Sequence, residues 1–176
     1  MRFAAICALL LLALVFAHGC ESQATPDGQA DPNAPGRAKR DGDAATPAIP
    51  ADAHAFNGHH YKVYEENLSW HEARAKCEKM GGYLACVESA EEQQFIADLA
   101  DGRYLFLGAT DEQEEGEWKW VNGSPFTYTN WLEGQPNNSF GSEHYLSTFE
   151  GGGWNDATVS GQDWWSPSGY ICEWNR

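Results

Sequence analysis

Two segments of the chain show the apolar spacing of helices that bury one face. The first follows Ser69 and ends at Gly81-Gly82, and its apolar positions are Trp70, Ala73, Cys77 and Met80. The second follows Ser89, and its apolar positions are Phe95, Ile96 and Leu99. Each serine stands three residues before a glutamate, which is the capping-box pattern that begins a helix. The sequence therefore predicts two helices.

Short runs of apolar and aromatic residues predict strands in most of the remaining sequence. They fall at residues 61–64, 83–87, 105–108, 118–121 and 145–149, around Trp154, and at 170–174. Because the helices come early in the chain and most strands come late, the sequence predicts an α+β fold.

Residues 124–143 lack the periodicity of a helix or a strand. About twenty residues without regular structure inside a compact domain tend to form a functional loop. Six amide or carboxylate side chains stand close to the end of this loop and directly after Trp154: Gln135, Asn137, Asn138, Glu143, Asn155 and Asp156. Such oxygens suit Ca²⁺, and Pro136 would point its two neighbours the same way if its peptide bond is cis. The alternative is that these are ordinary turn residues.

The first 54 residues predict two segments outside the folded domain. Met1-Arg2 and the apolar run at residues 3–17 are typical of a secretory signal peptide, predicted here as residues 1–19, and this run is too short to span a membrane. Residues 20–54 carry almost no large apolar side chain, which predicts a disordered tether. The folded domain is predicted at residues 55–176.

Cys20 follows the predicted signal directly, and two processing routes fit it. It can become the lipidated first residue of a bacterial lipoprotein, or the chain can be cut as an ordinary secreted protein. Either route exports the chain, so we expect a protein outside the cytoplasm that is lipid-anchored at the cell surface or secreted.

The charge of the chain excludes two classes of partner. The formal net charge is −15 at pH 7. Nucleic acids and anionic membrane surfaces are bound through basic patches, so neither is a predicted partner. A lipid on Cys20 is therefore the membrane contact that the sequence allows.

Three cysteines lie in the predicted domain. A bond between Cys77 on the first helix and Cys172 on the last strand would tie the ends of the domain together, and closing so long a loop contributes about 4–5 kcal/mol in the chain-entropy model. Cys86 would then be left over, and we interpret it as a small buried apolar residue. The histidines form no recognisable nucleophile arrangement with a serine or cysteine, so the chain is not expected to be an enzyme.

Several separate motifs, in the right order, resemble the C-type lectin-like domain. They are Ser69-Trp70-His71-Glu72-Ala73 with Cys77, Gly81-Gly82-Tyr83-Leu84-Ala85, Phe106-Leu107-Gly108-Ala109, Trp118-Lys119-Trp120, Thr129-Asn130-Trp131, Gln135-Pro136-Asn137, Trp154-Asn155-Asp156 and Tyr170-Ile171-Cys172-Glu173. The resemblance covers nearly all of residues 56–174. It implies two helices with short antiparallel strands and a long irregular ligand loop.

The resemblance also implies two Ca²⁺ sites. The principal site would use Gln135, Asn137, Glu143, Asn155 and Asp156, and its ion would bind two vicinal hydroxyls of a sugar. Phe140 is the candidate for packing on that sugar, and its alternative is a loop residue folded into the core. The accessory site would use Asp111, Glu115 and Asn138 together with Glu143. Asn138 and His144 stand where many members have Asp, which weakens this accessory site.

The chain departs from the family pattern in three places. Gln135-Pro136-Asn137 is a hybrid of the tripeptides that accompany mannose-type and galactose-type sugars, so the sugar stays unassigned. Tyr145 and Val159 replace the inner disulfide, and we expect them to pack together. Trp164-Trp165 lies in a segment longer than usual for the family.

We therefore expect a Ca²⁺-dependent module that binds carbohydrate or glycoconjugate. The alternative is a lectin-like protein-recognition or structural module that binds no sugar.

Overall fold

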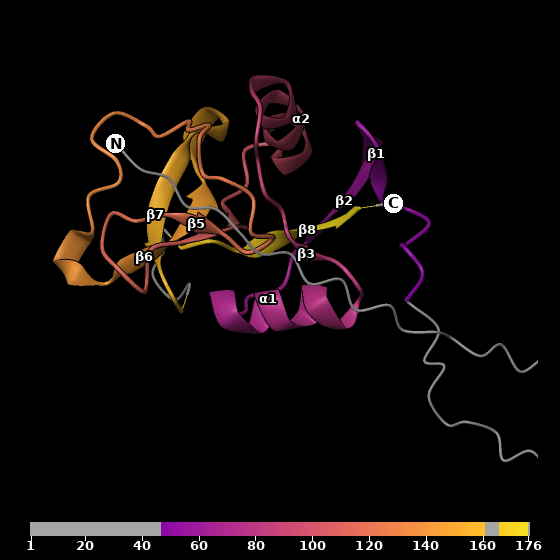
Figure 1. The fold of residues 1–176 in the computed structure, drawn as a ribbon, viewed down its shortest axis with the longest axis horizontal. Coiled ribbons are helices and arrows are strands. Elements are labelled where there is room, and N and C mark those ends of the chain that lie inside the picture. Colours follow the sequence, from indigo (N-terminus) through magenta and orange to yellow (C-terminus); the bar gives the residue numbers. More distant parts are fainter. Residues whose placement is uncertain (1–46, 161–165, 176) are drawn as a thin grey trace, which may run out of the picture. The chain divides into compact units, whose positions relative to one another are not determined.

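The structure, a computed structural model, describes residues 47–160 and 166–175 of the chain (Figure 1). The predicted signal peptide, Cys20, residues 21–46 of the predicted tether and Trp164-Trp165 lie outside the described residues.

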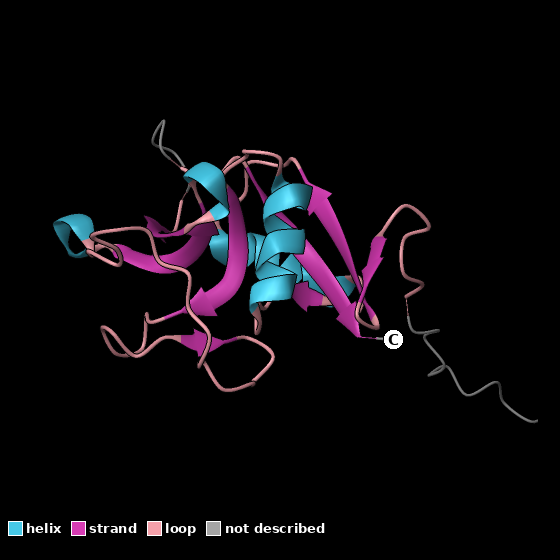
Figure 2. Cartoon of the chain, turned by 90° about the horizontal axis from the view of Figure 1, so that it is seen from above, coloured by secondary structure: helices cyan, strands magenta, loops and turns pink. Residues whose placement is uncertain are grey.

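The described residues contain two α-helices, two short 3-10 helices and eight strands. The helices are α1 (Trp70–Lys79), α2 (Ala90–Ala100), η1 (Ser139–Gly141) and η2 (Glu150–Gly152). The strands are β1 (His54–Phe56), β2 (His59–Tyr64), β3 (Tyr83–Leu84), β4 (Leu105–Thr110), β5 (Lys119–Trp120), β6 (Glu143–Thr148), β7 (Trp154–Thr158) and β8 (Gly169–Asn175). Both predicted helices and the α+β class are confirmed. Figure 2 shows how much of the chain between β5 and β6 is loop.

One mixed sheet joins the beginning of the domain to its end. Its strand order is β1-β2-β8-β4-β6-β7, with β3 beside β8 and β5 beside β4. Strand β2 pairs with β8 in antiparallel fashion along its whole length, whereas β4 and β8 run parallel. The C-terminal strand therefore lies at the centre of the sheet.

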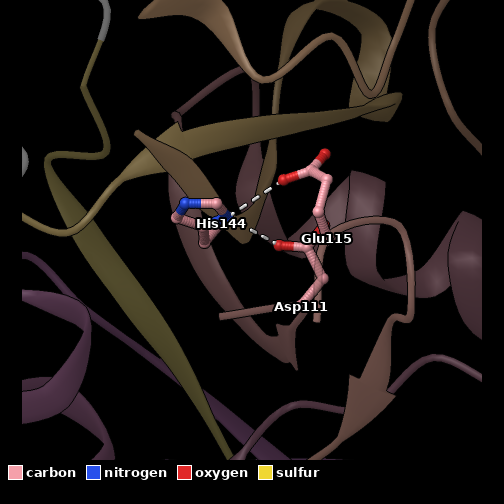
Figure 3. A group of neighbouring side chains, drawn as sticks. All are labelled: Asp111, Glu115 and His144. Atoms are coloured by element: carbon pink, nitrogen blue, oxygen red, sulfur yellow. Dashed lines mark hydrogen bonds and ion pairs between the residues drawn. The ribbon is translucent and has the colours of Figure 1, made fainter. Parts of the chain in front are cut away.

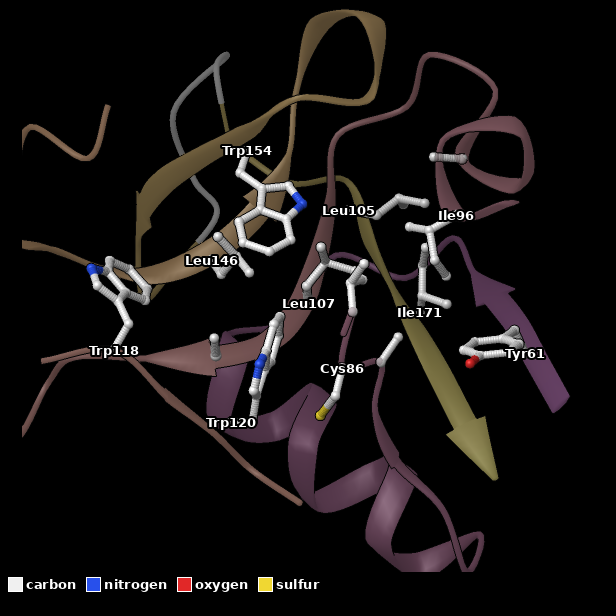
Figure 4. Close-up of a cluster of buried hydrophobic side chains, with 14 residues drawn as sticks. Tyr61, Cys86, Ile96, Leu105, Leu107, Trp118, Trp120, Leu146, Trp154 and Ile171 are labelled. Atoms are coloured by element: carbon white, nitrogen blue, oxygen red, sulfur yellow. The ribbon is translucent and has the colours of Figure 1, made fainter. Parts of the chain in front are cut away.

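Alternate residues of the central strands enter two hydrophobic clusters on opposite faces of the sheet, as the period of a strand requires. Leu105, Leu107 and Ile171 belong to the cluster that α2 covers (Figure 4). Their neighbours Phe106 and Cys172 belong to the cluster that α1 covers. The two helices consequently bury opposite faces of the same strands.

The two predicted capping boxes differ in the structure. Ser69 and Glu72 form the complete box at the start of α1. Ser89 accepts a hydrogen bond from the Glu92 backbone N–H, but the Glu92 carboxylate does not return to Ser89. It accepts hydrogen bonds from the Tyr61 hydroxyl and the Glu88 N–H instead. The buried Tyr61 hydroxyl needs an acceptor, and this need overrides the local capping pattern.

The buried face of α2 is only partly the predicted one. Ile96 is fully buried, whereas Phe95 and Leu99 are half-buried. Gln93 is buried as well, and its side chain donates to the Gly152 carbonyl and accepts from the Trp154 indole N–H, each at 2.6 Å. A polar residue of α2 thus connects this helix to β7.

The structure contradicts the predicted disulfide between Cys77 and Cys172. Both residues are free, buried cysteines, although they lie in the same hydrophobic cluster. Burial and a hydrogen bond with Cys172 raise the pKa of the Cys77 thiol, so it stays protonated and packs as a small apolar side chain. Cys86 is also a buried free thiol with a raised pKa, and its interpretation as a packing residue is confirmed.

Tyr145 and Val159 do not form the expected apolar pair. Tyr145 is buried against Trp70, with ring centroids 5.0 Å apart, and its hydroxyl donates to Glu112 at 2.7 Å. Val159 is 36% exposed. Tyr145 therefore packs against α1 and bonds the loop after β4. It does not pack against Val159, which replaces the other cysteine of the family's inner disulfide.

Ordered structure begins before the predicted boundary at residue 55. Strand β1 starts at His54, and Ile49 and Ala53 pack against the cluster beneath α1. The Lys62 ammonium also donates to the Asp52 carboxylate at 2.8 Å. The end of the predicted tether is consequently part of the domain surface.

Gly108 in β4 has no room for a side chain. A Cβ atom there would lie 2.2 Å from the Leu84 carbonyl oxygen and 3.0 Å from the Val121 side chain. We expect Gly108→Ala to lower the free energy of unfolding by about 1–3 kcal/mol, because a backbone atom cannot move aside cheaply. Urea unfolding of the variant and the parent protein measures this difference.

Gly153→Ala is the matched comparison, because its Cβ would meet the side chain of Leu132, which is half-buried and can turn away. Its loss of stability should be the smaller of the two. Equal stability of Gly108→Ala and the parent protein would contradict this account of β4.

Candidate functional site

The predicted ligands come from the irregular loop and from the β6–β7 hairpin. Within the hairpin, Asp156 lies opposite Leu146 and Asn155 lies opposite Ser147. Trp154 attaches the loop to β7 just before these two residues. Its backbone N–H donates to the Asn130 carbonyl at 2.9 Å, and its carbonyl accepts from the Leu132 N–H at 3.0 Å. The loop entrance and the Asn155-Asp156 pair are therefore held together by main-chain bonds.

Gln135 and Asn137 present their side chains to the same side. The peptide bond between Gln135 and Pro136 is cis. The Asn137 amide donates to the Gln135 side-chain oxygen at 2.7 Å, so the two predicted ligands are in direct contact. This is the arrangement that the sequence predicts for a cis proline between two ligands.

Asp156 is the fully buried member of the predicted ligand set. One carboxylate oxygen, Oδ2, accepts hydrogen bonds from the backbone N–H groups of Asn137 and Asn138, at 2.9 and 2.6 Å. The other oxygen, Oδ1, is buried and has no hydrogen-bond partner in the part of the chain that the structure describes. The Asn155 side-chain amide donates to the Asp156 carbonyl and completes the contact between these neighbours.

An unpaired oxygen of a buried carboxylate is costly without a cation. Hard oxygen ligands of this kind suit Ca²⁺, which takes six to eight of them. The residues around Asp156 therefore fit the ion that the sequence implies.

Glu143 lies at the start of β6 and closes the loop from its other end. Its carboxylate accepts from the Ser139 N–H at 2.9 Å, and its own N–H donates to the Asn138 side-chain oxygen at 3.1 Å. The structure thus links Gln135, Asn137, Asn155 and Asp156 by direct hydrogen bonds. Glu143 reaches this group through Asn138 and Ser139.

At the predicted accessory Ca²⁺ site, the structure gathers Asp111 and Glu115 with His144. Asp111, Glu115 and His144 offer ligand atoms that all lie within 4.8 Å of one another (Figure 3). His144 Nδ1 lies 3.0 Å from Asp111 Oδ1 and 3.5 Å from Glu115 Oε2.

Asn138 does not offer its oxygen to this cluster. Its amide nitrogen donates to Glu115, while its oxygen accepts from the Glu143 N–H. In this orientation Asn138 is a hydrogen-bond donor toward the accessory position. Its role as an accessory ligand stays a prediction.

His144 is the residue of this cluster that the sequence did not assign as a ligand. The sequence indicates it only as a replacement for Asp at an accessory position. The available signal was its place directly after Glu143, which puts its side chain next to the residues that follow β4.

Phe140 stands at the tip of the loop with its side chain fully exposed. Its backbone has a φ of 59°, a conformation that costs energy in a residue with a Cβ atom. The alternative that Phe140 folds into the core is therefore wrong.

An aromatic groove adjoins the ligand loop at Pro136. It has a volume of about 520 Å³ and is lined by Gly116, Glu117, Trp118, Lys119, Phe126, Trp131 and Pro136. Aromatic rings offer a flat apolar surface that packs well against apolar ligand faces.

The model of the family described as "Lectin C-type domain" matches residues 66–173. Hepatic lectin from Gallus gallus is 34% identical over 120 residues, which cover 67% of this chain and 56% of that protein. C-type lectin domain family 4 member M from Nomascus concolor is 35% identical over 129 residues, which cover 70% of this chain and 31% of that protein. The chain thus spans from a third to about half of these relatives' length.

Solved structures agree in fold. The carbohydrate-recognition domain of cow CD23, determined in the presence of a GlcNAc2Man3 oligosaccharide, has a TM-score of 0.67 and 30% identity, covering 74% of this chain and 98% of that one. The carbohydrate-recognition domain of mouse scavenger receptor C-type lectin has a TM-score of 0.66 and 33% identity, covering 73% and 97%. Herring type II antifreeze protein has a TM-score of 0.64 and 26% identity, covering 73% and 99%.

Because the two carboxylate oxygens of Asp156 have different surroundings, we expect Asp156→Ala and Asp156→Asn to change the free energy of unfolding differently when a chelator removes Ca²⁺. Asp156→Ala removes the acceptor for two backbone N–H groups and is expected to lower the free energy of unfolding by about 1–3 kcal/mol. Asp156→Asn keeps an acceptor and removes the buried charge, so it should be at least as stable as the parent protein. Urea unfolding in EGTA measures both.

Glu133→Gln, in the exposed part of the same loop, controls for the change in net charge and should leave stability unchanged. If Asp156→Asn lost as much stability as Asp156→Ala, the unpaired Oδ1 would not destabilise the folded protein as proposed.

Proposed function

Because this chain belongs to the C-type lectin family, we propose that it is a Ca²⁺-dependent carbohydrate-binding module displayed outside the cytoplasm. The family and its relatives are lectins, so the chain is not an enzyme.

The observation that supports the proposal best is the buried Oδ1 of Asp156, which has no hydrogen-bond partner among the described residues, while Oδ2 of the same carboxylate holds the ligand loop through Asn137 and Asn138. A cation in contact with this oxygen would compensate the buried charge. Gln135, Asn137, Glu143 and Asn155 would supply further oxygens to the ion. Together these residues would hold Ca²⁺.

When bound, Ca²⁺ supplies coordination positions at which two vicinal sugar hydroxyls replace water. The chain's residues then orient those hydroxyls. The Glu143 carboxylate can accept a hydroxyl proton, and the amide groups of Gln135 and Asn137 can accept and donate hydrogen bonds. Binding is an exchange of hydrogen bonds and ligands, and no bond of the sugar is made or broken.

The hybrid tripeptide limits the strength of this site. Of the five side chains only Glu143 and Asp156 are charged, because an amide stands at position 135. Fewer ligand charges lower the affinity for Ca²⁺. We therefore propose a site that needs Ca²⁺ at extracellular concentrations.

Export of the chain is part of the proposal. The predicted signal peptide and Cys20 support secretion or a lipid anchor at the cell surface. Within residues 47–160 and 166–175, the helices are all too short or too polar to cross a membrane.

Chelation tests the function directly. The purified protein should stay on sugar-coated resin in CaCl₂ and elute in EGTA, since the hydroxyls need the ion. At a Ca²⁺ concentration of about 100 times Kd, the ion should add about 2.7 kcal/mol to the free energy of unfolding. Asp156→Asn and Glu143→Gln should lose both effects, measured by resin binding and thermal melting.

Retention on the resin in EGTA would refute Ca²⁺-dependent sugar binding. If the chain instead captures a protein, and competing monosaccharides do not reduce the amount captured, the protein-recognition alternative is favoured. Glu133→Gln is again the matched control and should bind like the parent protein.

Phe140 is proposed to pack on the bound sugar, because its ring is fully exposed at the tip of the ligand loop. Phe140→Ala should weaken sugar binding by on the order of 1 kcal/mol, roughly five-fold, while the Ca²⁺-induced rise in melting temperature stays the same. Glycan titration by calorimetry and thermal melting measure the two effects.

Val159→Ala removes another exposed apolar side chain and should change neither quantity. Unchanged sugar affinity in Phe140→Ala would remove this residue from the site.

A further inference from the structure

We propose that Asp111, Glu115 and His144 form a second metal site that takes a divalent transition ion such as Zn²⁺ and not Ca²⁺. The proposal concerns the accessory position only and does not depend on sugar binding at the principal site.

The three ligand atoms are already gathered from separate segments (Figure 3). Asp111 directly follows β4, Glu115 lies in the turn after it, and His144 is the second residue of β6. The imidazole Nδ1 lies 3.0 Å and 3.5 Å from the two carboxylate oxygens. Ligands held about 2.0–2.2 Å from a tetrahedral ion are about 3.3–3.6 Å from each other. The two distances from Nδ1 are close to that value, and the two carboxylate oxygens lie within 4.8 Å of each other, so the exposed Glu115 side chain would complete the site by a small movement.

The surroundings of Nδ1 exclude a bare lone pair on that nitrogen. A bare nitrogen lone pair pointing at two carboxylate oxygens would be repelled by both. Either a proton or a metal ion must therefore lie on Nδ1. A proton can form one good hydrogen bond, whereas an ion bound to all three atoms satisfies both carboxylates at once.

The types of ligand favour a transition ion. Imidazole suits Zn²⁺, Cu²⁺ and Ni²⁺, whereas Ca²⁺ is held by oxygen ligands. Asn138, which would have offered an oxygen, turns its amide nitrogen toward Glu115. The position therefore lacks two oxygen ligands that the family pattern gives to Ca²⁺, and it has gained a nitrogen ligand.

Supporting contacts fix the ligands before an ion arrives. The side chain of Asp111 is 1% exposed, and its second oxygen accepts from the Gly116 N–H at 2.8 Å. The Asp111 backbone N–H donates to the His144 carbonyl at 3.2 Å, which holds two of the ligands together. Such outer contacts orient metal ligands and contribute to affinity. The side chain of Glu115 is 57% exposed, so solvent and an ion can reach the site.

Calorimetric titration of the untagged, EDTA-stripped protein with ZnCl₂ tests the site, because a histidine tag would bind Zn²⁺ itself. We expect one ion per chain that millimolar CaCl₂ does not displace. His144→Ala and Glu115→Gln should each weaken binding by about tenfold or more, since each removes one of three ligands. Glu115 is exposed, so its variant should fold even if His144→Ala does not. His144→Asp should lose Zn²⁺ and gain affinity for Ca²⁺.

Two controls separate this site from other histidines and from the principal site. His71 is half exposed and lies 3.2 Å from Glu112, yet His71→Ala should keep full Zn²⁺ affinity. Asp156→Asn should also keep it, even though it loses the proposed Ca²⁺ site. The proposal would be overturned if the protein did not bind Zn²⁺, or if His144→Ala and Glu115→Gln bound Zn²⁺ as tightly as the parent protein. The cluster would then be a metal-free ion pair.

Discussion

Trp154 joins the hydrophobic core to the ligand loop, and the geometry of the candidate site depends on that junction. Its side chain is fully buried, and its indole N–H donates to Gln93 of α2. Its ring packs against the aromatic residues of the loop and of β5, with centroids 5.7–6.0 Å away: Trp120, Phe126, Tyr128 and Trp131. Its backbone bonds the loop on both sides. A long loop without regular structure would otherwise be too mobile to hold a preformed set of ligands.

Asp156, two residues after Trp154, depends on this rigid junction. Asp156 is fixed in the sheet with a buried charge, and its pairing with two loop N–H groups orders Asn137 and Asn138. The unpaired oxygen then becomes a cost that the fold carries until a cation compensates it. Order in the loop and the proposed affinity for Ca²⁺ would thus both depend on one buried carboxylate.

Much of this fold follows from local patterns in the sequence. Both helices begin at their predicted serines, because capping and apolar spacing are local properties of the chain. Contacts between distant segments could not be predicted in the same way. Glu92 leaves its cap because Tyr61, far away in sequence, needs an acceptor. Strand β1 contains too few apolar residues to give a strand signal, and pairing with β2 forms it.

The same distinction applies to the candidate site. Four of the five predicted principal ligands lie in motifs, and the structure links these four by hydrogen bonds. Asp111 and Glu115 of the accessory set were predicted as well, but the orientation of Asn138 was not, because the direction of an amide depends on its partners. The Glu143 N–H takes the oxygen of Asn138, which leaves the amide nitrogen for Glu115. Likewise, the apolar positions of Cys77 and Cys172 predict proximity, but proximity does not determine whether two buried thiols are oxidised.

Charge explains why the two sites can coexist side by side. Each contains two carboxylates, Glu143 and Asp156 in one and Asp111 and Glu115 in the other, so one divalent ion would balance each. Asn138 lies between them and bonds Glu115 on one side and Glu143 on the other. A neutral amide at this position avoids a fifth negative charge in a chain whose net charge is already −15. Replacing the neighbouring carboxylate by His144 removes a further charge and changes the preferred ion. In the proposed assignment the departures from the family pattern act together, and they would convert a position suited to Ca²⁺ into one suited to a softer ion.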